Sequence, residues 1–213
     1  LKLDGAGNIV WEQTYGGSNN DDAQSIIQTS EGGYLVAGHT YSSNGDVGAN
    51  NGVQDYWMVK IDPTGVIQWE KNFGGSAIEY AWAVKQTSDD GYIVVGDSES
   101  SDGDVSGNQG VRDFWIVKTD SFGTLEWEKN YGGSGSERPK DVLQTNDGGY
   151  FVVGNSDSND GDISNHYDWD DVWLLKLDAS GNLEWEKSYG GSFGDFGESI
   201  IQTDSGDFII GSS

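Results

Sequence analysis

The chain lacks cysteine altogether and has only 2 prolines and 1 methionine among its 213 residues. The absence of cysteine excludes disulfides, zinc–thiolate sites and thiol nucleophiles. Positive charge is also scarce, since 11 lysines and arginines stand against 36 aspartates and glutamates, for a net charge of −25. Such a chain repels phosphate backbones and anionic lipid surfaces, and no apolar run approaches the ~20 residues of a membrane helix. We therefore expect neither nucleic-acid binding nor membrane insertion.

Glycine and aromatic residues are abundant instead. The chain holds 33 glycines, 9 tryptophans, 10 tyrosines and 7 phenylalanines, which is too much aromatic surface for a disordered chain. Its acidic, cysteine-free composition suits a secreted protein in a medium rich in calcium or salt, so the predicted location is extracellular or at a cell surface. The chain begins at Leu1 without a signal-peptide pattern, which we interpret as a mature or excised segment.

A repeat of 58 residues organises the sequence. A Trp-Glu pair, a Gly-Gly-Ser motif and a Gln-Thr pair return at this interval, and so does a second tryptophan two residues after an aspartate. The first tryptophan of each copy is Trp11, Trp69, Trp127 and Trp185, and the second is Trp57, Trp115 and Trp173. Self-similarity at a fixed interval indicates a repeat architecture. We treat 1–213 as a single repeat domain with copies at about 2–59, 60–117 and 118–175 and a partial copy at 176–213.

Alternation with a period of two predicts strands within each copy. Along residues 67–73, for example, Ile67, Trp69 and Phe73 fall on one face and polar residues on the other. The other three strands are expected at 81–87, 92–95 and 113–118. Four short antiparallel strands per copy predict an all-β fold of β-propeller blades, about four in this chain, because each small sheet must pack on its neighbour. The recurring tryptophans are expected in the core between these sheets.

The last copy lacks the long loop and most of the tryptophan-bearing strand. Residues 1–4 match the end of that strand, as found at 175–178. Two arrangements therefore stay open. The N-terminal strand completes a small four-bladed ring, or the chain is a segment of a longer array, which is the arrangement we favour.

The motifs of the repeat resemble those of the bacterial seven-bladed β-propeller (SBBP-type) repeat family. The resemblance is carried by Leu177-Asp178 through Gly181 to Trp185, by Gly190-Gly191-Ser192 with Asp195, and by the strand Gly91–Gly96. The spacing from Asp4 and Gly7 to Trp11 is also similar to the tryptophan-docking repeat of quinoprotein propellers. These resemblances imply a propeller in which indoles lock neighbouring blades, in large secreted or surface-attached bacterial proteins whose biochemical roles are mostly unassigned.

The long loop of each copy, near 41–54, 99–112 and 157–170, carries an acidic pattern. Calcium takes 6–8 oxygen ligands, which carboxylates, amides and loop carbonyls would supply. Asx-turns and loop capping explain the same residues, since no window matches an EF-hand loop. Calcium is therefore a possible cofactor. Its candidate ligands are Asn44, Asp46, Asp55, Asp102, Asp104, Asp113, Asp160, Asp162 and Asp171.

A second recurring acid follows the Gly-Gly-Ser motif of each copy. It is aspartate in two copies and glutamate in the other two, at Asp21, Glu79, Glu137 and Asp195. An acid repeated in every copy is normally structural. We predict that it caps the turn or pairs with the recurring lysines.

No catalytic constellation stands out. His39 and His166 occupy unrelated repeat positions without a spaced serine or cysteine partner. Residues 190–194 match the pattern G-x-S-x-G but lie in a hairpin region, not between a strand and a helix.

Departures from the repeat are the better candidates for a binding site. In the third long loop His166, Tyr167 and Trp169 replace small and amide residues of the sister loops. We predict that they contact a glycan or a protein ligand, the alternative being that the loop folds its aromatic residues onto its own blade. Trp82 is a second candidate, because its equivalents are Gln24, Lys140 and Glu198.

The predicted function is a non-enzymatic secreted or cell-surface bacterial scaffold or binding module of the adhesion type, stabilised by calcium if the loops bind it. Neighbouring repeats of a full-length protein are expected as partners. The alternative is a carbohydrate-active hydrolase or lyase with acids in a central funnel, which requires one acid pair that the repeat does not copy. A pure spacer that binds nothing is the third reading.

Overall fold

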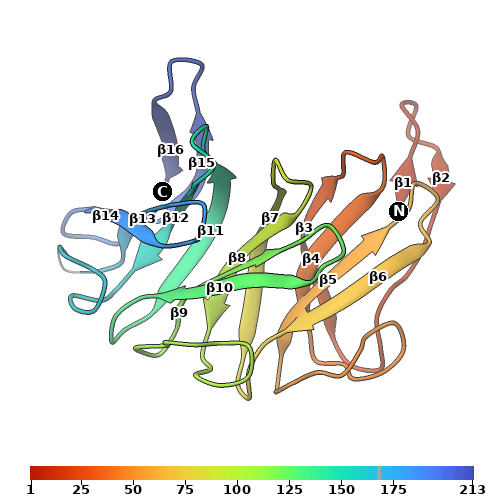
Figure 1. Ribbon diagram of the computed structural model, residues 1–213, viewed down its shortest axis with the longest axis horizontal. Helices are drawn as coiled ribbons and strands as arrows, with labels where there is room; N and C mark the ends of the chain where they lie inside the picture. The colour runs from red at the N-terminus through yellow and green to blue at the C-terminus, as the bar shows by residue number, and fades with distance from the viewer. Residues whose placement is uncertain (167–168) are drawn as a thin grey trace.

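The computed structural model describes residues 1–166 and 169–213, and these residues form an all-β fold of sixteen strands without a helix. It follows that no helix of the described residues is able to span a membrane. Three four-stranded antiparallel sheets follow one another along the chain, each with its strands in sequence order (Figure 1). This arrangement of repeated sheets confirms the predicted fold of propeller blades.

We call the three sheets blades 1, 2 and 3. Blade 1 consists of β3 (Asp21–Gln28), β4 (Tyr34–Thr40), β5 (Asp55–Ile61) and β6 (Ile67–Phe73). Blade 2 consists of β7 (Glu79–Gln86), β8 (Tyr92–Ser98), β9 (Asp113–Thr119) and β10 (Leu125–Tyr131). Blade 3 consists of β11 (Glu137–Gln144), β12 (Tyr150–Ser156), β13 (Asp171–Leu177) and β14 (Leu183–Tyr189). Each sheet begins at the acid after a Gly-Gly-Ser motif, so the sheets are out of phase with the copies counted from residue 2.

Two half-blades flank the complete sheets. β1 (Lys2–Leu3) pairs with β2 (Ile9–Trp11), and β15 (Gly197–Gln202) pairs with β16 (Phe208–Ser212). The first pair corresponds to the third and fourth strands of a blade and the second pair to the first and second. They lie at opposite ends of the row of sheets (Figure 1), so they do not join into a fourth blade and the four-bladed ring is not formed.

The core lies between the blades. Tyr56 of blade 1 packs on Trp115 of blade 2 with ring centroids 4.5 Å apart, and its hydroxyl donates to the Trp115 carbonyl at 2.9 Å. Phe114 and Trp173 repeat the contact between blades 2 and 3 at 4.7 Å. Trp115 and Trp173 are fully buried. Each sheet therefore shares its apolar face with the next, as repeat proteins require.

Trp69 and Trp127, which are the first tryptophans of their copies, each dock on a glycine turn of the following blade. A Cβ built on Gly123 would lie 3.0 Å from the Trp69 ring, and one built on Gly181 would lie 2.7 Å from the Trp127 ring. These close approaches, together with φ values of 75° and 77°, require glycine at both turns. They confirm that indoles lock neighbouring blades. Trp185 has no described turn against it and is 40% exposed, so the prediction that it lies in the inter-sheet core is wrong.

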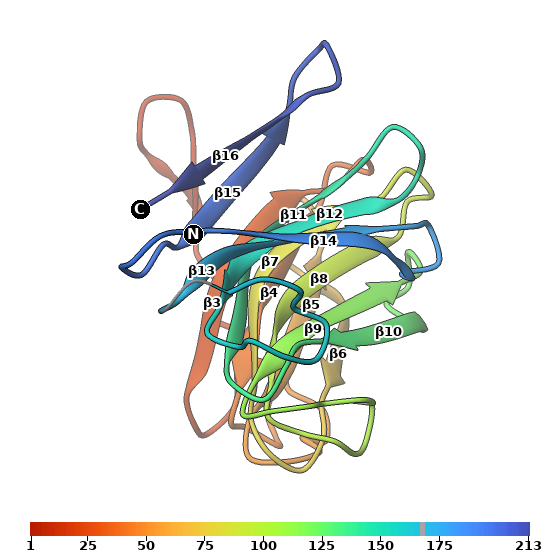
Figure 2. The ribbon, with the colours of Figure 1, turned by 90° about the vertical axis from the view of Figure 1, so that its left-hand side faces the viewer.

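Every blade has two structurally different ends. The loop end carries the Gly-Gly-Ser linker and the long loop, and the turn end carries the two short hairpin turns. In the first two blades the hairpin turns point upward in Figure 1 and the long loops downward. A view along the row shows that strands of successive blades cross at an angle (Figure 2), as expected for sheets arranged about an axis.

Candidate functional site

At the loop end, each linker between blades closes around a buried acid. Oε2 of Glu79 accepts the backbone N–H of Gly75 at 3.0 Å, and Oε1 accepts the Ser98 hydroxyl at 2.8 Å. Glu137 makes the same two bonds, to Gly133 at 2.9 Å and Ser156 at 2.8 Å. Burial raises the pKa of both glutamates. The second recurring acid is therefore a cap of the linker, and the recurring lysines find other partners.

The acids of the long loops cap the same linkers from the other side. Oδ1 of Asp102 accepts the N–H of Ser76 at 2.7 Å, and Oδ2 of Asp104 accepts the N–H of Gly74 at 3.2 Å. The other copies repeat these bonds with Asn44 and Asp46 on Ser18 and Gly16, and with Asp160 and Asp162 on Ser134 and Gly132. These six of the nine predicted calcium ligands thus cap the linkers by accepting backbone hydrogen bonds, as the capping interpretation predicts.

Neighbouring loops are also tied to one another. The Asn51 amide of blade 1 donates to Asp104 of blade 2 at 3.3 Å, and the Gln109 amide of blade 2 donates to Asp162 of blade 3 at 2.7 Å. The long loops therefore contribute to the contacts between neighbouring blades.

Asp55 and Asp113, at the start of the third strand of blades 1 and 2, are completely buried. Oδ2 of each accepts one backbone N–H, from Asn51 at 2.5 Å and Gln109 at 2.6 Å. Oδ1 of each has no hydrogen-bond partner within the described residues. Burial raises the pKa of Asp55 to about 6 and that of Asp113 to about 7, and the neighbouring glutamates add to the rise.

Each of these aspartates faces the capping glutamate across the junction. A Cβ built on Gly74 would lie 2.5 Å from Oδ1 of Asp55 and 2.5 Å from Oε2 of Glu79. At Gly132 the corresponding distances to Asp113 and Glu137 are 2.5 and 2.4 Å. Two buried carboxyl groups therefore share the space beside each glycine. The sequence showed that both acids recur, but their pairing across a junction between blades depends on the tertiary structure.

Two of the predicted calcium ligands, Asp55 and Asp113, thus each lie beside a glutamate that was not predicted as a ligand. Across residues 1–166 and 169–213, no group of three or more histidine, aspartate and glutamate side chains is placed to hold a metal ion. Asp171, the third aspartate of the series, has the imidazole of His166 beside it, with Nδ1 at 3.3 Å from its Oδ2.

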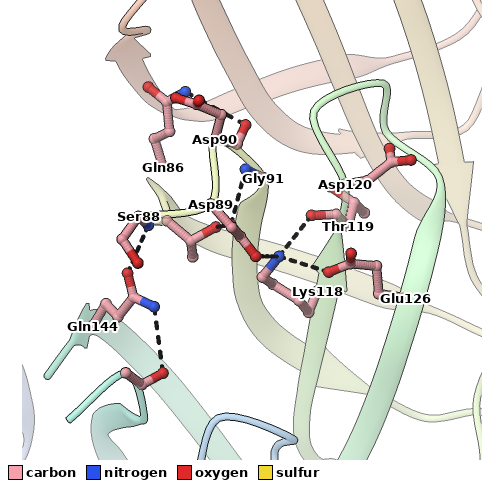
Figure 3. Close-up of polar contacts among 12 residues, drawn as sticks. Gln86, Ser88, Asp89, Asp90, Gly91, Lys118, Thr119, Asp120, Glu126 and Gln144 are labelled. Carbon is pink, nitrogen blue, oxygen red and sulfur yellow. Dashed lines mark hydrogen bonds and ion pairs between the residues drawn. The ribbon is translucent and has the colours of Figure 1, made fainter.

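The turn end explains the recurring lysines and Gln-Thr pairs. Nζ of Lys118 donates to Asp89 at 2.9 Å and to Glu126 at 2.7 Å, which joins β9 and β10 to the turn between β7 and β8 (Figure 3). The Gln144 side chain of blade 3 accepts the N–H of Ser88 at 2.8 Å. Gln86 makes the same bond to Ser30 of blade 1 at 2.8 Å. The Lys118 contacts stabilise blade 2 internally, whereas the repeated glutamine contacts join neighbouring blades.

The predicted ligand loop is only partly described, because Tyr167 lies outside the described residues. The structure places His166 against Asp171 and leaves Trp169 66% exposed. No aromatic ring of the described residues packs on Trp169. The structure thus shows no contact that joins His166 with Trp169 in one site.

Trp82 belongs to a larger cluster at the loop end of β7. Its ring stacks on Tyr80 with centroids 5.8 Å apart and an interplanar angle of 15°, and the His39 ring meets Tyr80 edge-on at 4.9 Å. The indole N–H donates to Oδ1 of the fully buried Asp97 at 2.6 Å. Sequence reasoning found Trp82 but missed the others. The available signal was that each of these positions changes residue type from copy to copy.

No protein-family profile and no curated protein sequence matches this chain. A crystal structure of a protein of unknown function from Bacteroides caccae matches over 79% of this chain and 67% of its own, at 11% identity and a TM-score of 0.30. A likeness of this size carries no argument about function. What is confirmed is the repeated four-stranded sheet, whereas membership of the SBBP-type family stays a prediction.

Proposed function

We propose that this chain is a non-enzymatic scaffold and binding module of the adhesion type, built from SBBP-type propeller repeats and located at a bacterial surface or outside the cell. One observation carries the proposal. The acids that cap the linkers recur from blade to blade and mark no single catalytic site, whereas side chains that depart from the repeat gather around Trp82. Residues that recur in each copy pack the blades together, and residues that differ between copies are the candidates for binding a ligand.

A carbohydrate-active hydrolase or lyase is the second candidate, and Asp97 is the residue that bears on it. Asp97 is not copied, since its equivalents are His39 and Asn155, and burial raises its pKa to about 6. A catalytic acid must also reach its substrate. Asp97 is fully buried and bonded to the Trp82 indole, so its position favours support of the ring over catalysis.

Calcium is proposed for the junctions between blades. The side chains that would hold it are the pairs Asp55 with Glu79 and Asp113 with Glu137, because each pair offers an Oδ1 atom without a hydrogen-bond partner in the described residues. Carboxylate oxygens are the ligands calcium prefers, and loop carbonyls and water would complete the 6–8 that it takes. Bound calcium would neutralise the charge that burial makes unfavourable.

Neighbouring repeats are the proposed partners of the end faces. Ile26 on blade 1 is 65% exposed, although its equivalents Val84 and Val142 are 1% and 0% exposed under the preceding blade. At the other end, Trp185 and Tyr189 are 40% and 56% exposed. Further blades stacked on these faces would bury the same positions at both ends.

The test is a panel of surface glycans and proteins scored for binding and for product. Binding with the ligand recovered intact is the expected result. Release of a shortened sugar would overturn the proposal and indicate a hydrolase or lyase, and loss of that release in Asp97→Asn would identify the acid. A chain that binds nothing on the panel would contradict the binding role and favour a spacer.

A further inference from the structure

The positions at which the blades differ most lie near the loop end of the first strand of each blade, in β3, β7 and β11. The second residue of the first strand is Asp22 in blade 1, Tyr80 in blade 2 and Arg138 in blade 3. Two residues on, where the strand register shifts in each blade, the chain carries Gln24, Trp82 and Lys140, and in blade 2 the Tyr80 and Trp82 rings stack on each other. β7 packs between β3 and β11, so these unequal side chains form one continuous surface.

The aromatic rings of this surface lie between cations. The Arg112 guanidinium lies 5.1 Å from the centroid of Tyr80, and Nζ of Lys140 lies 4.4 Å from the ring of Trp82. Both distances are within the range of cation–π attraction. Guanidinium, phenol, indole and ammonium thus form a stack that joins blade 2 to blade 3.

A buried acid, Asp97, and a half-buried one, Glu99, hold the centre of the stack in place. Asp97 accepts the Trp82 indole N–H at 2.6 Å and lies 3.6 Å from Nη1 of Arg112. Arg112 also donates to Glu99, with Nη2 at 2.6 Å from Oε1. Rings and a guanidinium fixed in this way lose little rotamer freedom when a ligand binds.

The two cations of β11 are not fixed in the same way. Arg138 and Lys140 flank the buried Pro139, and neither makes an ion pair or a side-chain hydrogen bond with the described residues. By contrast, the turn-end lysines of the three blades, Lys60, Lys118 and Lys176, are each paired with an acid. Two available cations beside a rigid aromatic pair, in a chain of charge −25, are the groups that an anionic ligand requires.

We propose that the aromatic patch formed by Tyr80, Trp82, Arg112, Arg138 and Lys140 binds a glycan through an acidic sugar. The sugar carboxylate would bond to Arg138 and to Lys140, which Trp82 holds at the end of the stack, and the sugar ring would lie along the exposed edge of the stack. A ligand with one isolated carboxylate fits better than a polyanion, because the field of the whole chain repels dense negative charge. This inference rests on the proposed binding function and names its ligand class and site.

The test compares two disaccharides that differ only in one carboxylate, glucuronosyl-glucose and cellobiose, by titration calorimetry on the full chain. The acidic sugar is expected to bind at least ~10-fold more tightly, the scale of one charge-assisted hydrogen bond. Equal binding of both sugars, or binding of neither, would overturn the inference. An N-acetylated acidic dipeptide in place of the sugar tests for a peptide ligand, and tighter binding of that dipeptide would likewise overturn it.

Substitutions taken from the sister blades keep the fold in the comparison. Trp82→Gln and Lys140→Gln each introduce the residue found at Gln24, and both are expected to weaken the acidic sugar ~10-fold or more. Lys129→Gln on the outer strand removes the same charge elsewhere and should leave binding unchanged. If Lys140→Gln binds like the unsubstituted chain, the patch is not the site.

The two proposals fail in different ways. Cleavage of the disaccharide would sink the non-enzymatic function. Absence of carboxylate preference, with other ligands on the panel still bound, would sink only the acidic-sugar site.

Discussion

The junctions at the loop end and the aromatic patch lie a few residues apart on the same strands, yet they follow opposite rules. At the two junctions between complete blades, equivalent aspartates accept the same backbone N–H groups, at 3.2 and 3.1 Å in one bond and 2.7 Å in the other. On the patch, equivalent positions carry an acid, an aromatic ring and a cation. The residues that hold the blades together are thus repeated from copy to copy, whereas the residues of the patch differ between copies.

The largest effect is expected for the buried tryptophans of the repeat. Trp173→Ala should lower the free energy of unfolding by about 3–5 kcal/mol, because it empties a fully buried site between blades 2 and 3. Trp82→Gln should cost roughly 1–2 kcal/mol, because that ring is only half-buried. Urea denaturation measures both. Equal losses of unfolding free energy would mean that Trp82 stabilises the fold as much as Trp173 does, and that the patch does not differ from the junctions.

The pH dependence of stability tests whether the junction aspartate Asp113 holds a proton in the folded chain. Because burial raises the pKa of Asp113 to about 7 from 3.8, the folded chain binds more protons than the unfolded chain between these values. In calcium-free buffer, stability should therefore fall as the pH rises from about 4 to about 7. Asp113→Asn should flatten this slope and raise the free energy of unfolding at pH 8 by on the order of 3 kcal/mol.

The control for this prediction is Asp204→Asn, which removes one charge from an exposed turn. It should keep the slope of the unsubstituted chain in urea melts between pH 4 and 8. Parallel profiles for Asp113→Asn and the unsubstituted chain would show that Asp113 does not hold its proton in the folded state.

One glycine position distinguishes a complete junction from an open one. Gly133→Ala should cost about 1–3 kcal/mol, because the new Cβ would lie 2.6 Å from the Asp160 carbonyl oxygen. Gly191 is its equivalent in the next copy and has nothing within 4 Å, so Gly191→Ala should be nearly neutral. Thermal melts of both variants give the comparison, and a similar loss in the two would contradict the packing of the long loop on the linker.

The smallest effect is expected from calcium. If the junction pairs hold the ion, a chelator should lower the Tm by roughly 2–4 °C, the shift that about 1 kcal/mol produces in a chain of this size. Asp113→Asn should reduce that response. An identical melt with and without chelator would show that the junctions are not stabilised by calcium.

Part of this molecule was predictable from its sequence because the repeat copies local chemistry. The 58-residue interval, the strand alternation and the tryptophan spacing predicted the blades and their docking. The capping role of Glu79 and Glu137 was also predictable, since an acid that returns in every copy has a structural task. Trp82 was visible as a departure, but one residue does not make a site.

The remaining features depend on contacts between residues far apart in the chain. The pairing of Asp55 with Glu79, the alignment of Arg112 and Lys140 on either side of two rings, and the exposure of Trp185 depend on which blade lies against which face. Periodicity specifies that sheets form and that they stack, because it records hydrophobic alternation within one copy. It does not specify what meets across a junction, because side chains from two copies come together there only after both have folded.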